Sequence, residues 1–141
     1  MADPDRLTAE LILCDWAEAL NGKLYIQGAG WVRVAPDQGI AIAIAALVHV
    51  PYSATNKKHD VAVSLVNEDG QPFPQTDDPG PFRMELEFEV GRPPGMRPGE
   101  GSIVPFAAKL MGLAFPAGGY SFVATSGDEE LARVSFVSRE G

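Results

Sequence analysis

The sequence predicts an all-β protein, a two-layer antiparallel β-sandwich of seven or eight strands with an immunoglobulin-like arrangement. Apolar residues recur mainly with a period of two, and turn residues interrupt this pattern at short intervals. The 15 glycines and 12 prolines also suit short strands joined by turns. A chain of 141 residues is the size of one domain, so residues 1–141 are expected to form one sandwich, with 1–8 as a flexible leading segment. A barrel is the alternative architecture.

The first two strands are expected on either side of Asn21-Gly22. This dipeptide tolerates the positive φ angles of a tight type I′ hairpin, which predicts strands over residues 9–16 and 23–34. Gly28 and Gly30 fall inside the second of these strands, where glycine often marks a bulge or a close backbone approach.

The third strand, residues 39–50, has apolar side chains on both faces. One face is bulky and should enter the core, while the other is rich in alanine. The alanine face, with Ala41, Ala43 and Ala45, is either covered by the protein itself or offers a flat apolar patch to a partner. The bulky face contains Ile40, Ile42, Ile44, Ala46, Val48 and Val50.

The central part of the chain predicts two more strands. Val61, Val63 and Leu65 should point inward from the fourth strand, and residues 82–90 alternate apolar with charged side chains as a half-buried strand does. The next segment, 91–101, is so rich in proline and glycine that it should form a long surface loop.

The last strands are expected over residues 102–115, 118–125 and 131–138. Pro105 restricts the first of them to a sheet edge or a bulge, because proline donates no hydrogen bond to a ladder. The ending from Phe115 onward resembles the last two strands of immunoglobulin-like sandwiches. That resemblance implies that Tyr120 packs at a sheet corner and bonds the backbone through its hydroxyl, a feature of fold and not of function.

Several short segments match one known family over nearly the whole chain. These segments are Cys14-Asp15, residues 21–28 (NGKLYIQG), Val50-Pro51-Tyr52 with residues 56–59 (NKKH), and Leu65 with Glu68-Asp69-Gly70. In these segments the chain resembles a family of small bacterial proteins catalogued only as a domain of unknown function, and this resemblance implies a β-sandwich without a settled biochemical role.

The charge distribution argues against two classes of partner. The net charge is −8 and is shared evenly between the two halves of the chain, so there is no basic stripe for a nucleic acid and no cationic face for a membrane. The acidic start of the chain does not fit a signal peptide, and the single cysteine, Cys14, agrees with a reducing compartment. A cytoplasmic location is therefore expected.

No catalytic, metal or cofactor motif is recognisable. Cys14, His49 and His59 lack the paired spacing of a zinc site, and neither a Gly-x-Ser-x-Gly elbow nor a phosphate-binding loop with its lysine is present. The protein is therefore expected not to be an enzyme and to need no metal or cofactor.

Two loops contain the polar residues that could bind a ligand. The loop at residues 52–59 combines an aromatic ring, an amide, two cations and an imidazole, which could hold a polar or anionic molecule. The alternative is that its polar groups only bond the turn backbone. Arginines in the proline-rich loop could likewise contact a partner. The candidate residues are Tyr52, Asn56, Lys57, Lys58, His59, Arg92 and Arg97.

Two functional hypotheses follow. The first is a non-enzymatic interaction or structural module, in which the alanine-rich face or the proline-rich loop contacts another protein or a second copy of the chain. The alternative is a binder of small polar or anionic ligands that uses the loop from Tyr52 to His59.

Overall fold

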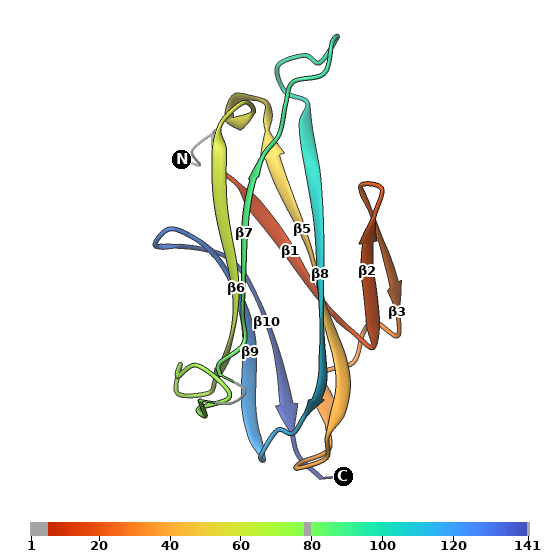
Figure 1. The fold of residues 1–141 in the computed structure, drawn as a ribbon, viewed down its shortest axis with the longest axis vertical. Helices are drawn as coiled ribbons and strands as arrows, with labels where there is room; N and C mark the ends of the chain where they lie inside the picture. Colours follow the sequence, from red (N-terminus) through yellow and green to blue (C-terminus); the bar gives the residue numbers. More distant parts are fainter. Residues whose placement is uncertain (1–5, 78–79, 141) are drawn as a thin grey trace.

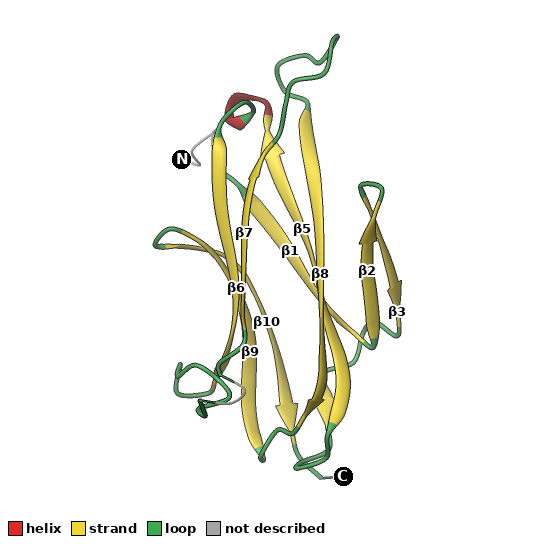
Figure 2. Cartoon of the chain, in the orientation of Figure 1, coloured by secondary structure: helices red, strands yellow, loops and turns green. Residues whose placement is uncertain are grey.

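A computed structural model describes residues 6–77 and 80–140, in which strands form nearly all of the regular structure (Figure 2). The only helical element in these residues is one 3-10 turn, η1. The all-β prediction is therefore confirmed. The elements are β1 (Thr8–Cys14), β2 (Trp16–Leu20), β3 (Lys23–Gln27), β4 (Arg33–Val34), β5 (Ile40–Pro51), η1 (Tyr52–Ala54), β6 (Lys58–Asn67), β7 (Arg83–Glu89), β8 (Gly101–Leu113), β9 (Gly118–Ser126) and β10 (Glu129–Ser138).

The strands form three sheets (Figure 1). The first has the order β1-β5-β8, the second has the order β4-β10-β9-β6-β7, and the third is the hairpin of β2 and β3. Neighbouring strands are antiparallel except for the short β4, which runs parallel to β10. The prediction of antiparallel pairing therefore holds for every described pair but this one.

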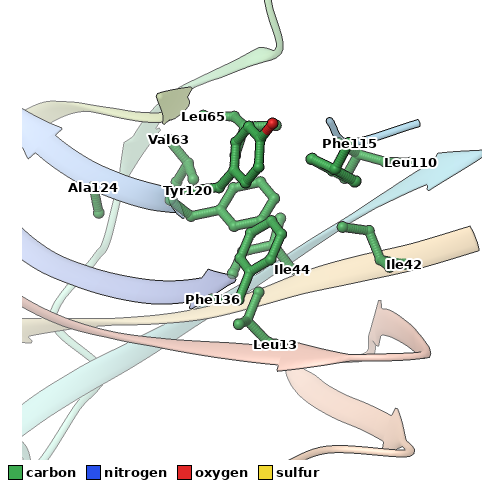
Figure 3. Close-up of a cluster of buried hydrophobic side chains, with 11 residues drawn as sticks. Leu13, Ile42, Ile44, Val63, Leu65, Leu110, Phe115, Tyr120, Ala124 and Phe136 are labelled. Carbon is green, nitrogen blue, oxygen red and sulfur yellow. The ribbon is translucent and has the colours of Figure 1, made fainter. Parts of the chain in front are cut away.

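The main core lies where side chains from the two larger sheets meet. Ile42 and Ile44 of β5 contact side chains from β6, β9 and β10, and Figure 3 shows the rings of Tyr120 and Phe136 among them. Burying a large apolar side chain contributes roughly 1.5–3 kcal/mol, so this cluster is the main source of stability. The predicted inward face of β5 is confirmed. The buried members of the cluster are Leu13, Ile42, Ile44, Val63, Leu65, Leu110, Phe115, Tyr120, Phe122, Ala124 and Phe136.

The beginning of the chain is tied to the fold earlier than expected. Residues 1–5 of the predicted flexible segment lie outside the described residues. Leu7, however, is buried in a second core cluster, and β1 already begins at Thr8. Arg6 also forms an ion pair with Glu129 at the start of β10.

The predicted first strand is divided at Asp15, where the chain bends. The residues before the bend form β1, which pairs with β5, and those after it form β2, which pairs with β3. The predicted hairpin turn is confirmed, because Asn21 and Gly22 have φ angles of 53° and 74°, as a type I′ turn requires.

The predicted long strand over 23–34 is wrong, because β3 ends at Gln27. Gly28 and Gly30 have φ angles of 70° and 103°, which a strand ladder cannot accommodate. At Gly28 the backbone also approaches Asp15 so closely that a Cβ atom would lie 2.1 Å from the Asp15 Oδ2 atom. The chain therefore turns out of the hairpin here.

The later strands follow the predicted pattern. The side chains of β7 alternate between exposed and half-buried along its length. Pro105 lies on β8, which is an edge strand of its sheet, as predicted. The Tyr120 hydroxyl donates a hydrogen bond to the Pro116 carbonyl at 2.6 Å, so the predicted bond to the backbone is also confirmed.

Candidate functional site

The polar loop between β5 and β6 is a compact turn. After η1, the Thr55 hydroxyl donates to the Tyr52 carbonyl at 2.6 Å, and the Asn56 N–H donates to the Val90 carbonyl at 2.7 Å. Asn56 has a φ of 62°, a conformation that asparagine tolerates better than most residues. The backbone bonds thus fix the loop against the end of β7.

Arg92, from the proline-rich loop, lies on this turn. Its Nε donates to Thr55 Oγ1 at 2.9 Å and its Nη2 donates to the Tyr52 carbonyl at 3.1 Å. The guanidinium carbon lies 3.8 Å from the centroid of the Tyr52 ring, within the range of a cation–π interaction. Two candidate sites that are far apart in sequence therefore form one junction.

His59 also has a partner within the chain. Its Nε2 lies 2.7 Å from the Ala54 carbonyl, which can only accept, so Nε2 carries the proton of this hydrogen bond. The imidazole packs beside Phe88, with 5.7 Å between the ring centroids. The arrangement fixes His59 as a brace between the loop and β7.

The remaining candidates in the two loops are exposed. Lys58 Nζ lies 4.0 Å from Glu87, a weak pair at the surface. Asn56 and Lys57 are exposed beside it. Arg97 lies in its own tight turn, in which its carbonyl accepts from the Glu100 N–H at 3.0 Å.

The alanine-rich face of β5 is largely covered. Ala43 and Ala45 are both 0% exposed, and they pack with Cys14 and Ala17 under the β2–β3 hairpin. The prediction that these two alanines contact a partner is therefore corrected. Their small side chains instead let the hairpin approach the sheet. Ala41, at the start of β5, remains exposed and lines a surface hollow together with Asp15.

Cys14 is an unreactive member of this packed layer. Burial raises the pKa of its thiol, and the neighbouring Asp15 carboxylate raises it further. The thiol donates a weak hydrogen bond to the Ala43 carbonyl at a sulfur to oxygen distance of 3.7 Å. A thiol that ionises reluctantly and is fully buried is a poor nucleophile.

The outer face of the hairpin exposes large apolar side chains next to the polar Glu18 and Gln27, a feature that the sequence analysis missed. Leu20 and Tyr25 are 50% and 47% exposed, and they line a shallow hollow of about 350 Å³ with Trp16. Lys109 of β8 lies over the Trp16 ring at 4.7 Å and holds it in place. A signal was present in the sequence, because the alternation of the two strands places Leu20 and Tyr25 on the face opposite Ala17.

Within residues 6–77 and 80–140, no group of three or more histidine, cysteine or acidic side chains is arranged to hold a metal ion. The same residues contain no helix that is long and apolar enough to cross a membrane.

Comparison with protein families identifies the domain. Residues 10–137 match the model of a family of unknown function (DUF6941), and this match spans almost the entire fold described above. The chain belongs to this family. Comparison with curated proteins and with solved structures gives no significant match. The family assignment agrees with the resemblance seen in the sequence and leaves the biochemical role of the DUF6941 domain open.

Proposed function

We propose that this DUF6941 protein is a non-enzymatic interaction module that contacts another protein chain through the outer face of the β2–β3 hairpin. The observation that supports this most strongly is the exposure of Leu20 and Tyr25, at 50% and 47%, on a hairpin that pairs with no other strand in the described residues. Exposed apolar side chains that lie together and are rimmed by polar residues commonly mark protein–protein contact sites.

The composition of this face fits a protein contact. Tyrosine and tryptophan are enriched among the residues that dominate binding energy, and Tyr25 and Trp16 line the same hollow. Lys109 restricts the Trp16 ring, so the ring would lose little conformational freedom on binding.

The hairpin is also supported by the sheet beneath it. Its inner side chains, Leu24 and Ile26, pack against the layer that contains Ala43 and Ala45. A two-stranded hairpin is marginal in water when it stands alone, and here the sheet beneath it supplies the missing support. A partner would therefore meet a rigid surface.

The alternative function, a small-ligand site at residues 52–59, has weaker support. Two Arg92 nitrogens and one His59 ring nitrogen, which would have to receive an anion, already bond atoms of the chain. A ligand would have to break these bonds or rely on exposed lysines alone. The junction is better explained as a brace between two loops.

Co-purification of matched variants tests the proposed contact. A tagged chain would be crosslinked in its host and purified as wild type, as Leu20→Lys with Tyr25→Lys, and as Val32→Lys. Val32 is 64% exposed outside the hairpin, so its variant controls for added charge at an apolar surface position. We expect the double hairpin variant to lose a crosslinked species that the other two retain. Retention of all species by the double variant would overturn the proposal.

A further inference from the structure

The free edge of β3 differs from the other exposed strand edges. Proteins protect edge strands with charges, prolines, bulges or very short lengths. In the described residues, β7 presents Glu85, Glu87 and Glu89, and β4 has only two residues. The edge strand β8 contains Pro105 and is interrupted by a bulge near Gly112, where φ is 70°. Strand β1 contains Glu10.

Strand β3 carries a single charge, Lys23, at one end, and its remaining residues are Leu24, Tyr25, Ile26 and Gln27. Figure 1 shows β3 as the outermost strand on its side of the molecule, with β2 between it and β8. An edge of this composition and position is open to pairing with another strand.

The geometry of the hairpin identifies the backbone groups on that edge. The turn contains two residues, so the flanking residues Leu20 and Lys23 face each other directly. In an antiparallel ladder, the N–H and C=O groups of alternate residues point to opposite sides. The groups of Lys23, Tyr25 and Gln27 therefore point toward β2, and those of Leu24 and Ile26 point outward.

We propose that the β3 edge pairs with the β3 edge of a second copy of the chain, antiparallel and centred on Tyr25, so that the two hairpins form one four-stranded sheet. This inference goes beyond the proposed function, because it concerns the free edge of β3, whereas the proposed contact is the exposed outer face of the hairpin, with which this edge shares Tyr25. In this register, Leu24 of each copy faces Ile26 of the other, and their outward backbone groups form hydrogen-bonded pairs. It is the two-fold register that pairs all five residues of β3.

Charge favours β3 over β2 as the contacting strand. Lys23 of one copy would face Gln27 of the other, so no like charges are opposed. A two-fold pairing of β2 edges would instead place Glu18 opposite Glu18, because Glu18 is the middle residue of that strand. The chain carries a net charge of −8, so an edge without acidic residues is where two copies can approach with least repulsion.

Side chains complete the contact. Tyr25 is exposed on the outer face and would lie opposite the second Tyr25 as a pair without direct backbone hydrogen bonds, the closer kind of cross-strand pair. Aromatic pairs across strands add to sheet stability. Two five-residue strands bury less area than a standard interface, so the dimer should be weak and dependent on concentration.

Sedimentation of the full chain over a concentration series provides the first test. We expect a monomer–dimer equilibrium for wild type and for Val32→Glu, and a dissociation constant raised at least about tenfold by Tyr25→Glu, since this variant opposes two carboxylates. An equal mixture of Tyr25→Glu and Tyr25→Lys should recover the dimer that neither variant forms alone. Failure of the mixture to recover it would contradict the register.

Cysteine crosslinking provides the second test. Opposed Cα atoms at a pair of this kind are about 4.5 Å apart, within reach of a disulfide, so Tyr25→Cys should form a covalent dimer on mild oxidation. Gln27→Cys is the control, because the two copies of residue 27 would be about 13 Å apart. Equal crosslinking of both variants would overturn the pairing. A strictly monomeric chain whose hairpin variants still lose a different co-purified protein would overturn it while leaving the proposed function intact.

Discussion

The Arg92 guanidinium carbon lies 3.8 Å from the centroid of the Tyr52 ring, although 40 residues separate the two in the chain. Together with the hydrogen bonds from Arg92 to Thr55 and to the Tyr52 carbonyl, this contact joins two loops at one end of the molecule. This junction attaches the start of the proline- and glycine-rich loop to the turn that follows β5.

Removal of the Arg92 side chain should loosen this junction. We expect Arg92→Ala to lower the free energy of unfolding by about 1 kcal/mol, because it removes a solvent-exposed cation–π contact and two hydrogen bonds. Urea denaturation would measure the change. Arg97→Ala, in the same loop, should change stability by no more than about 0.5 kcal/mol. Equal effects of the two substitutions would contradict the assigned role of Arg92.

A charge placed under the hairpin should be far more damaging. Ala45 is 0% exposed, so Ala45→Lys would force a long cationic side chain into the layer below β2 and β3. We expect a loss of at least about 3 kcal/mol in the free energy of unfolding, from overpacking together with charge burial. Ala41→Lys, on the same strand but exposed, is the matched control and should be nearly neutral in thermal denaturation. A neutral Ala45→Lys would show that the hairpin does not cover this face.

The two glycines that follow β3 allow two causes of destabilisation to be compared, namely a positive φ angle and a steric clash. Gly28 and Gly30 both have positive φ angles, but only at Gly28 would a Cβ atom meet Asp15, at 2.1 Å from Oδ2 and 2.9 Å from Cβ. Gly30→Ala should therefore show only the backbone penalty of about 1–2 kcal/mol, while Gly28→Ala should lose more. Urea denaturation of both variants would separate the backbone penalty from the steric clash. A larger loss of stability at Gly30 would contradict the close approach of Gly28 to Asp15.

The environment of the Tyr120 hydroxyl predicts that the stability of the protein falls as the pH rises into the alkaline range. Burial raises the pKa of its hydroxyl, and the Asp37 and Glu68 carboxylates raise it further. An unfolded tyrosine ionises near pH 10, so above about that pH the unfolded state loses its proton first. The stabilisation that the Tyr120 hydroxyl contributes is therefore fully present below about pH 10 and declines as the pH rises above this value. Tyr120→Phe should lose about 1–2 kcal/mol at neutral pH, with the lost Pro116 hydrogen bond, and show a smaller alkaline decline. Identical alkaline slopes for the two proteins would contradict this.

Local patterns in the sequence were sufficient for much of the fold. The period of two in β7, the Asn21-Gly22 turn and the inward face of β5 depend on neighbouring residues, and all three were predicted. The strand over 23–34 was predicted wrongly because the close approach of Gly28 to Asp15 is a tertiary contact. Periodicity alone cannot distinguish a bulge from the end of a strand.

The candidate sites were less predictable, because their partners are distant in sequence. Nothing near residue 52 indicates that Arg92 will lie on its ring. The alanine-rich face was identified as apolar on both sides of the strand, and both a cover and a partner remained possible explanations. The hairpin that covers Ala43 and Ala45 resolves this choice, and its own outer face then exposes Leu20 and Tyr25.

Site-specific photocrosslinking in the host cell tests the role of the hairpin most directly. A photoreactive phenylalanine analogue would replace Tyr25 in one protein and Met111 in another. Met111 is 75% exposed on β8 and serves as the control for an accessible apolar position. The account predicts a discrete protein adduct at position 25 that is absent at position 111. No adduct at position 25, or the same adducts at both positions, would contradict the claim that the hairpin is the contact surface.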